Sequence, residues 1–168
     1  MMAGMESESM TTTPISIFEE IFPGDTNAYG TAFGGKVLAL IDRAAGLAAS
    51  RFAKCHFVTA SLDALEFREA VRQGEIAEVA AEVVYTSKHT CAVKTRVFAI
   101  DKTRWDRRQC CEGILFMVAI GPDNSVQPIP QLVPNTEADQ EAWDEAHAIH
   151  MRFTKRKKSA SKIPKQKQ

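Results

Sequence analysis

One acidic residue, Asp42, lies in a segment of the chain that is otherwise almost entirely apolar. The stretch 33–53 has no proline and is rich in alanine and leucine, which predicts one long helix. On such a helix Asp42 shares a face with Leu38, Ala45 and Ala49. A carboxylate among apolar groups is costly unless it is paired or hydrogen-bonded. We therefore predict that Asp42 does chemistry, as a general base or as a nucleophile.

A purely structural role for Asp42 stays open at this point. The polar residues Lys36, Arg43 and Ser50 recur every seven positions and predict one narrow solvent-facing stripe, which Asp42 does not join. In the structural interpretation, Asp42 pairs with Arg43 or with an arginine at an interface.

The loop before this helix contains three glycines, Gly30, Gly34 and Gly35, within the segment 25–35. The first N–H groups of a helix have no partner inside the helix, and the helix dipole favours negative charge beside them. Gly34 and Gly35 are thus candidates for stabilising a developing oxyanion. A tightly packed turn explains the glycines equally well when they are considered alone.

Around these residues the sequence predicts an α+β fold. Alternating apolar positions favour strands, and turn sequences separate them. The expected strands cover residues 15–22, 57–67, 77–85, 91–99 and 108–120. The order of elements predicts one five-stranded antiparallel sheet wrapped around the long helix. The last strand is apolar on both faces, so we expect it to be central or covered by a partner.

Composition and charge limit the class of protein. A chain of 168 residues suits one domain, and the sequence has neither a signal peptide nor an apolar stretch of membrane-spanning length, so a cytoplasmic protein is expected. The cysteines Cys55, Cys91, Cys110 and Cys111 lack metal-finger spacing and are predicted to be reduced packing residues.

The two ends of the chain differ from the middle. Residues 1–13 have no apolar periodicity and are predicted to be disordered. A capping box at Thr136–Asp139 predicts a peripheral helix that ends near Phe153. Residues 152–167 hold eight Lys or Arg and no acid, which leaves thirteen basic and 21 acidic residues, a formal charge of −8, in the first 151. A solvated basic tail is the simplest interpretation.

Several blocks of sequence together resemble the hot-dog acyl-CoA thioesterases, a family that includes the YciA-type enzymes and the halves of the brain cytosolic acyl-CoA hydrolase. The resemblance covers about residues 15–130, and six blocks carry it in order. They are Asp25–Asn27 (followed by Gly30), Phe33–Gly35, Ile41–Gly46, Val58–Ser61, Val71–Glu75 and Tyr85–Thr90. The implied domains are a hot-dog domain at 14–134 and a peripheral helix with a basic tail at 135–168.

The resemblance implies hydrolysis of acyl-CoA thioesters without a metal or a cofactor. In the family an aspartate on the central helix and an asparagine in the preceding loop form a shared site, and these map to Asp42 and Asn27. The resemblance further implies dimers whose sheets join edge to edge, each site combining Asn27 from one chain with Asp42 from the other. Such dimers commonly associate as trimers of dimers, which makes a hexamer the expected assembly.

Coenzyme A carries phosphates at one end, and the turn 86–90 offers hydroxyls and a cation for them. By resemblance Thr86, Ser87 and Lys88 lie at the nucleotide end, while Thr59 and Ser61 run beside the pantetheine arm. An exposed polar hairpin turn explains Lys88 and His89 as well.

Other classes fit the sequence less well. An α/β-hydrolase needs a G-x-S-x-G elbow, which is missing. His147 and His150 have no second ligand cluster for a metal, and the adjacent Cys110 and Cys111 have no evident histidine partner. The main alternative is a hot-dog module that binds acyl-CoA as a sensor without hydrolysing it, and a dehydratase ranks last because His56 and His89 are poorly placed.

Overall fold

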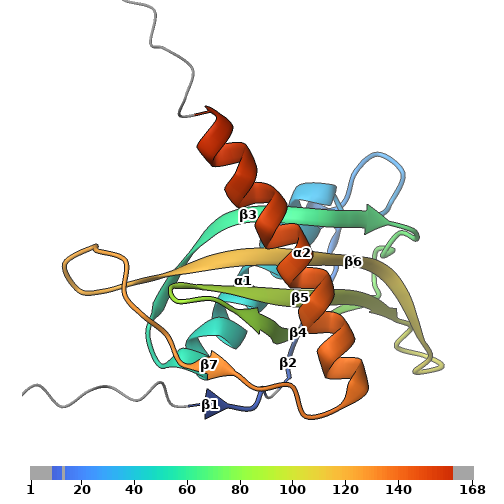
Figure 1. The fold of residues 1–168 in the computed structure, drawn as a ribbon. Helices are drawn as coiled ribbons and strands as arrows, with labels where there is room; N and C mark the ends of the chain where they lie inside the picture. Colours follow the sequence, from blue (N-terminus) through green and yellow to red (C-terminus); the bar gives the residue numbers. More distant parts are fainter. Residues whose placement is uncertain (1–8, 13, 161–168) are drawn as a thin grey trace, which may run out of the picture.

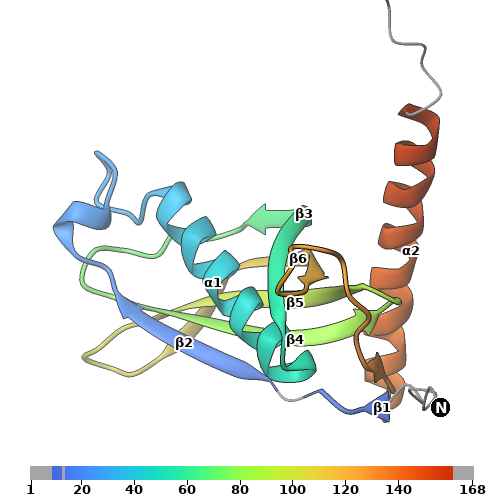
Figure 2. The same ribbon diagram turned by 90° about the vertical axis from the view of Figure 1, so that its left-hand side faces the viewer.

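A computed structural model describes residues 9–12 and 14–160 of the chain. Five strands form one antiparallel sheet in the order β2-β4-β5-β6-β3, and a long helix lies against each face (Figures 1 and 2). The strands are β1 Ser9–Met10, β2 Ile15–Glu20, β3 His56–Phe67, β4 Ile76–Thr86, β5 Thr90–Ile100, β6 Arg107–Ile120 and β7 Gln131–Leu132. The helices are α1 Gly34–Ala53 and α2 Glu137–Ala160, with a short 3-10 helix at Pro23–Asp25. The predicted α+β fold, a five-stranded antiparallel sheet around one long helix, is confirmed.

Helix α1 fits against the sheet because its buried face is built mainly from small residues. Ala44, Ala45 and Ala49 are fully buried, and Leu40 and Ile41 fill the space beside them. Alanine lets the helix approach the strands closely and has the highest helix propensity. The helix ends at Ala53, where the next residue, Lys54, takes a left-handed conformation (φ 56°) that reverses the chain into β3.

Strand β3 lies at one edge of the sheet and is irregular. Its pairing with β6 shifts register between Thr59 and Ser61 and again between Asp63 and Glu66. At the second irregularity Leu65 lies over Gly113, and a β-carbon on Gly113 would come within 2.8 Å of the Leu65 side chain. The bulges bend β3 around α1 while its outer edge remains unpaired in the single chain.

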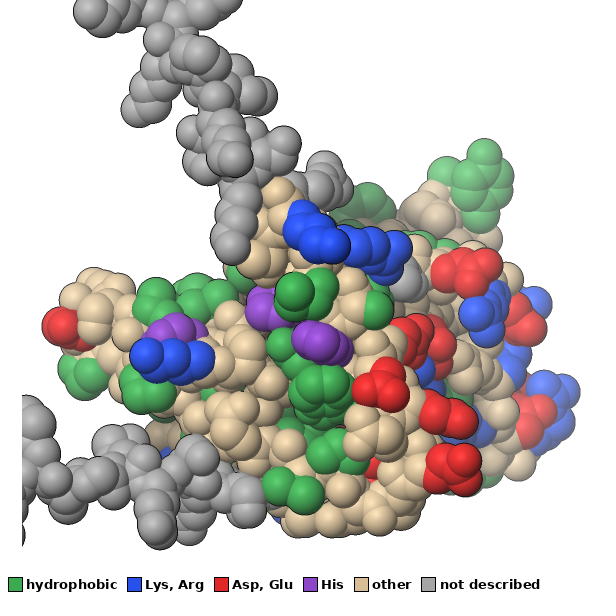
Figure 3. Space-filling view, viewed as in Figure 1, with side chains coloured by type: hydrophobic (Ala, Val, Ile, Leu, Met, Phe, Trp, Pro, Cys, Tyr) green, Lys and Arg blue, Asp and Glu red, His purple; other side chains and the backbone are tan. Residues whose placement is uncertain are grey.

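Helix α2 covers the opposite face of the sheet, as Figure 2 shows most clearly. Ala146 and Ile149 are buried against Ile114 and Phe116 of β6, and Trp143 meets the Tyr85 ring edge-on at 5.0 Å. In Figure 3, which views this face, histidine side chains lie among hydrophobic ones at the centre. β6 lies between β5 and β3, and α2 of the same chain covers its apolar outer face. Of the two expectations for this strand, a central position is therefore confirmed, and no partner is needed to cover its face.

Some predicted boundaries also change. Residues 9–10 form β1, which pairs in parallel with β7, although the sequence predicts disorder there; residues 1–8 and 13 lie outside the described chain. Helix α2 continues to Ala160 instead of ending near Phe153, so the first part of the basic segment is helical, and residues 161–168 are not described. Within the described residues no helix is long and apolar enough to cross a membrane. The domain limits 14–134 and 135–168 remain a prediction.

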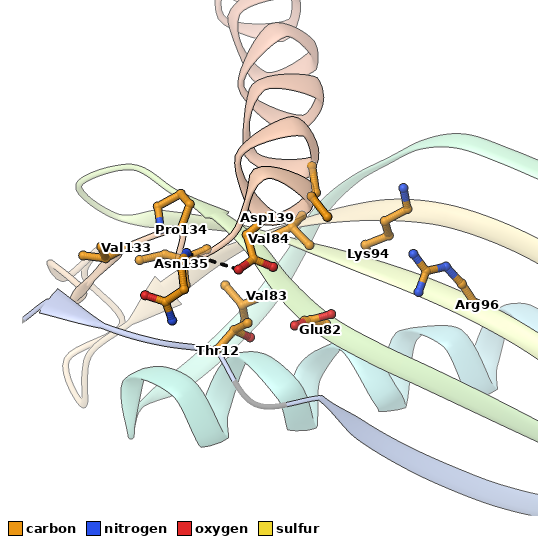
Figure 4. A pocket seen from close by; sticks show the side chains of 13 residues that line it. Thr12, Glu82, Val83, Val84, Lys94, Arg96, Val133, Pro134, Asn135 and Asp139 are labelled. Atoms are coloured by element: carbon orange, nitrogen blue, oxygen red, sulfur yellow. Dashed lines mark hydrogen bonds between the residues drawn. The ribbon is translucent and has the colours of Figure 1, made fainter.

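A hollow on the α2 side of the sheet contains an unusual carboxylate, Glu82 (Figure 4). Glu82 lies on β4 beneath Asp139, which caps the start of α2 by accepting hydrogen bonds from the N–H groups of Asn135 and Thr136. Burial raises the pKa of Glu82, and the negative charge of Asp139 raises it further. Arg96 is close enough to oppose this shift in part.

We expect the Glu82→Gln variant to be more stable than the wild type near pH 7 and equal to it near pH 4. A carboxyl group whose pKa is raised by folding binds its proton more tightly in the folded state, so ionisation destabilises that state increasingly as pH rises through its pKa. Thermal unfolding of both proteins across this pH range tests the prediction, and a stability difference that does not depend on pH would contradict it.

Candidate active site

Asp42 lies at the margin of the packed face of α1, beside strand β3, and is exposed in the single chain. Its Oδ1 accepts a short hydrogen bond from the hydroxyl of Thr59 on β3. The sequence predicts Asp42 among buried residues, and this part of the prediction is wrong for one protomer. The solvent-facing side of α1 is wider than a single stripe and includes Leu38 and Leu47, which are 38% and 55% exposed.

Asp42 and Thr59 border an open groove between α1 and the free edge of the sheet. The groove continues along Gly46, Leu47 and Ser50 of the helix and along Phe57 and Val58 of the strand, with Met117 of β6 at its base. Arg43, Ser50 and His56 add polar groups to the lining, and the Thr59 hydroxyl fixes one carboxylate oxygen. The other oxygen, Oδ2, has no hydrogen-bond partner among the described residues. This arrangement can orient a carboxylate toward a water or a substrate.

The alternative in which Asp42 forms an ion pair with Arg43 is wrong. The Arg43 guanidinium donates to Glu19 of β2 at 2.6 Å, and Lys36 also pairs with Glu19. The hydrogen bond from Lys36, assisted by Arg43, holds the pKa of Glu19 below its usual value. No ion pair involves Asp42 within the described part of the chain, so its charge is not used to stabilise the protomer.

The two glycines Gly34 and Gly35 form the first turn of α1, and both are exposed. Phe33 precedes them and offers no side-chain cap, while its carbonyl already accepts from Lys36 and Val37. A β-carbon on Gly34 would meet no atom within 4 Å, so the space beside this turn is open. The N–H groups of Gly34 and Gly35 are unused donors at the helix start, with open space at Gly34, whereas the Phe33 ring lies against Gly35, where a β-carbon would come within 2.5 Å of it.

Asn27 lies on a loop that projects from the molecule before α1 (Figure 2). The loop is closed at its base by the bridge between Thr26 and Ala32. The Asn27 side chain holds the loop together: its Oδ1 accepts from the Tyr29 N–H at 2.9 Å, and its Nδ2 donates to the Thr31 hydroxyl at 3.0 Å. The loop also presents exposed aromatic rings, with Tyr29 90% exposed.

One protomer does not bring all predicted site residues together. Asp42 lies eight residues after Gly34 on the same helix, which is about 12 Å along its axis. A single carbonyl group cannot contact the Asp42 carboxylate and the Gly34 N–H at that separation. Asn27 lies beyond the start of the helix and does not line the Asp42 groove.

The turn predicted to bind coenzyme A is only partly open. Thr86 is buried, and its hydroxyl accepts the N–H of Leu132 at 2.9 Å, so it anchors β7. Ser87 donates to the Thr90 carbonyl, and the His89 ring is turned inward, with Nδ1 buried and unpartnered among the described residues. Lys88 alone of the proposed ligands in this turn is exposed.

Ser61 also lies apart from the site. The bulge after Thr59 pairs Thr59 with Met117 on the α1 face but Ser61 with Phe116 on the α2 face. The two residues assigned to the pantetheine arm are thus on opposite sides of the sheet. In a regular strand Thr59 and Ser61, two residues apart, would lie on the same face. The bulge between them adds one residue and reverses the face, and the sequence pattern does not show where a bulge occurs.

The pairing of Thr59 with Asp42 is a feature that the sequence interpretation missed. It assigned Thr59 to ligand binding alone. A threonine on the edge strand of the sheet that packs on α1 is nevertheless close enough to reach the helix.

The cysteines agree with their predicted role, since burial raises the pKa of Cys91 to about 12 and that of Cys111 to about 11. His150 bonds Tyr85 through Nδ1, and no metal-binding group of three side chains occurs in the described residues.

Comparison with known proteins gives consistent results. The model of the thioesterase superfamily matches residues 29–105. The cytosolic acyl coenzyme A thioester hydrolase of Mus musculus is 26% identical over 151 residues, which cover 88% of this chain and 39% of that protein. The chain therefore spans about two fifths of the length of this curated relative.

Two solved structures extend the similarity over nearly the whole chain. An apo-hexameric acyl-CoA thioesterase is 33% identical with a TM-score of 0.81, covering 93% of this chain and 99% of that one. An acyl-CoA hydrolase from Staphylococcus aureus, solved with butyryl coenzyme A and coenzyme A, is 26% identical with a TM-score of 0.80, covering 92% and 94%. That hydrolase has also been solved with an aspartate, a threonine or an asparagine replaced by alanine. With its fold, its Asp42–Thr59 pair and these similarities, the chain belongs to the hot-dog acyl-CoA thioesterase family.

Proposed function

We propose that the protein hydrolyses acyl-CoA thioesters to a carboxylic acid and free coenzyme A. The observation that carries this proposal is the Asp42 carboxylate, held by the Thr59 hydroxyl on the exposed side of α1 and not used in any ion pair of the described chain. A carboxylate that is oriented by one hydroxyl, is free of ion pairs in the described chain and borders a groove is suited to catalysis.

The proposed chemistry needs an activated oxygen and a stabilised oxyanion. As a general base, Asp42 takes a proton from water as the water oxygen attacks the thioester carbon. The negative charge that develops on the carbonyl oxygen is stabilised by the N–H groups of Gly34 and Gly35. The intermediate then expels the coenzyme A thiolate, which takes up a proton. Direct attack by Asp42 would instead form an anhydride, and a single turnover in ¹⁸O-labelled water distinguishes the two routes.

The separation along α1 favours a site shared between two protomers. Since about 12 Å divides Asp42 from Gly34 in one chain, the carboxylate of one protomer must act together with the helix start of another. The free edge of β3, the exposed Leu38 and Leu47, and the projecting loop with Tyr29 are surfaces that a second copy can cover. Asn27 lies on that loop and would reach the partner's site, where it would orient water or substrate.

The related hydrolase from Staphylococcus aureus supports the choice of residues. An aspartate, a threonine and an asparagine were the residues replaced in its variants, the same three types as Asp42, Thr59 and Asn27. Lys88 is the residue we assign to the phosphates of coenzyme A. The reaction needs no metal or cofactor, and the cytoplasmic location remains a prediction.

Replacement of Asp42 by asparagine should lower kcat/KM for an acyl-CoA by about a thousandfold, the size expected for loss of a general base. The fold should be retained, because Asp42 is exposed and makes no ion pair in the described chain. The release of free thiol measures activity, and Asp144→Asn on the exposed side of α2 is the matched control. Near wild-type turnover in Asp42→Asn would rule out the assignment.

The Thr59→Val variant should lose about tenfold to a hundredfold in kcat/KM. The Thr59→Ser variant should keep most of its activity because it retains the hydroxyl.

Mixing two inactive variants tests the shared site. Asn27→Ala and Asp42→Ala proteins, after subunit exchange, should regain activity, because each mixed dimer then holds one site with both residues intact. The recovered rate should reach at most half of the wild-type rate in that dimer. Differently tagged chains verify the exchange independently, and Asn27→Ala alone must be strongly impaired for the test to apply. Verified heterodimers that stay inactive would show that the site lies within one chain.

The smallest active species should be a dimer, and we expect a hexamer built as a trimer of dimers. The unpaired edge of β3 and the apolar exposed positions on α1 are costly to leave in water. Light scattering coupled to size exclusion measures the mass directly. A fully active species at the monomer mass of 18.6 kDa would contradict this prediction.

A further inference from the structure

A bridge of charged side chains joins the loop that carries Asn27 to the sheet and to α1. The loop follows β2 and precedes the helix (Figure 2). Lys36, which directly follows the two glycines that begin α1, forms ion pairs with both Glu19 and Asp25, the latter at 3.0 Å. Glu19 belongs to β2, and Asp25 ends the 3-10 helix from which the loop leaves. One ammonium group therefore connects three elements of the chain.

The bridge is shielded from solvent on most sides. The side chains of Lys36, Asp25 and Glu19 are 24%, 22% and 31% exposed. Water and salt weaken such a partly shielded ion pair less than a fully exposed one. Hydrogen bonds to Glu19 and Asp25 raise the pKa of Lys36, and the hydrogen bond from Lys36 lowers the pKa of each carboxyl group. All three groups are therefore ionised at neutral pH.

Asp25 in turn fixes both ends of the loop. Its second carboxylate oxygen accepts from the Phe22 N–H at 3.0 Å, and its backbone carbonyl accepts from the Phe33 N–H at 2.8 Å. Phe33 is the residue before α1, so the loop both leaves and returns beside Asp25. In the described chain, no ion pair or hydrogen bond other than those of Lys36 joins the Asp25 side chain to β2 or α1.

The two arms of the loop are anchored by different means. The later arm is bonded through its backbone to the β3–β4 connection, because Ala32 donates to the Val71 carbonyl and Gln73 donates to the Gly30 carbonyl. The earlier arm, which carries Asn27, lacks such an anchor: residues 23–28 make no backbone hydrogen bond to a strand of the described sheet. The Lys36 side chain therefore supplies the link that backbone bonds supply for the later arm.

Loss of the Lys36 charge should disturb this arm in particular. Glu19 and Asp25 would then share no cation, and like charges brought together repel each other. Arg43 still binds Glu19 at 2.6 Å but makes no ion pair with Asp25 in the described chain. Asp25 is thus the group expected to move away, together with the loop. The Asp42 carboxylate takes no part in the bridge.

We propose that Lys36 is a positioning residue for the reaction: it holds Asn27 and the start of α1 as one unit, and this unit serves the site whose Asp42 belongs to the partner subunit. The proposal rests on the proposed thioesterase function and its shared site. Lys36 acts through the loop and the helix start and does not touch the substrate. A displacement of about 1 Å in a positioning group can cost roughly a hundredfold in rate, so the bridge matters for catalysis.

The Lys36→Met variant should lower kcat/KM for an acyl-CoA by about tenfold to a hundredfold. Lys36→Arg retains a cation for both carboxylates and should keep most of the activity. Lys94→Met is the matched control, because Lys94 is a similarly shielded lysine, 18% exposed, that pairs with Glu145 on the α2 side of the sheet. The control should have wild-type activity. Wild-type activity in Lys36→Met would overturn the proposal.

Mixed dimers show which part of the site Lys36 serves. In a dimer of one Lys36→Met chain and one Asp42→Ala chain, one site combines the intact Asp42 of the first chain with the intact Asn27, glycines and Lys36 of the second. Activity per mixed dimer, determined with two different tags, should reach up to half of the wild-type rate. In a dimer of Lys36→Met and Asn27→Ala chains every site has a defect, so the rate should not exceed half that of Lys36→Met alone.

A merely structural role for Lys36 gives a different pattern. If Lys36 only stabilised its own chain, or acted through Arg43 on Asp42 of the same chain, the mixture with Asp42→Ala would show no recovery. That result would overturn the proposal. If Lys36→Met does not fold, Asp25→Asn weakens the same bridge from its other side and should give the same pattern in both mixtures.

Reference measurements separate this proposal from those on which it rests. A wild type that releases no thiol from any acyl-CoA would reject the proposed function. A wild type that is active, with no recovery from mixing Asn27→Ala and Asp42→Ala, would reject the shared site and with it the role of Lys36. Recovery in that pair but none in the mixture of Lys36→Met with Asp42→Ala would reject the positioning role alone.

Discussion

The fixed rise of an α-helix is the constraint on which the proposed site depends. Eight residues separate Gly34 from Asp42, and at 1.5 Å per residue they lie about 12 Å apart on one rigid rod. During attack on a carbonyl group, the attacking oxygen and the carbonyl oxygen that becomes the oxyanion are only a few ångströms apart. Both groups therefore serve one substrate only if they come from different chains. A site shared between chains would account for three features of the single chain. They are the exposed position of Asp42, the free edge of β3 and the projecting loop that carries Asn27.

Helix α1 is held by packing against the sheet on one side, and its other side stays exposed in the single chain. Ala44, Ala45 and Ala49 bring α1 close to the sheet, while α2 covers the opposite sheet face through Ala146 and Ile149. A helix of the same chain thus packs on each face of the sheet, and the surfaces that remain for a partner are the outer side of α1 and the two free strand edges, β2 and β3, of which the β3 edge borders Asp42. Bulges in β3 help to form that surface, since they turn Thr59 toward Asp42 and Ser61 away from it.

The sequence predicts regular elements well and their exposure poorly. Period-two alternation along 77–85 and 91–99 and the proline-free alanine run of 33–53 predict β4, β5 and α1 nearly to the residue, because local periodicity determines them. Asp42 was predicted on an apolar face with Leu38, Ala45 and Ala49, yet only the two alanines are buried and Asp42 lies exposed at the margin of that face, since a residue pattern does not show where the packed face of a helix ends. Thr86 and Ser61 were placed with the ligand by family resemblance, and the sequence did not predict that Thr86 would bond Leu132 or that β3 would shift register before Ser61, because these are tertiary features with no local signal.

Burial by a partner would also change the chemistry available to Asp42. In the single chain its carboxylate is exposed, and water competes with Thr59 for its oxygens. When a second protomer covers the outer side of α1, water is excluded and electrostatic interactions in the groove become stronger, because the effective dielectric constant falls. Assembly would then supply two things at once: the N–H groups of the partner's helix start for the oxyanion, and the dry surroundings that make Asp42 reactive. A dissociated protomer would lose both, which makes hydrolysis by a free chain doubly unfavourable.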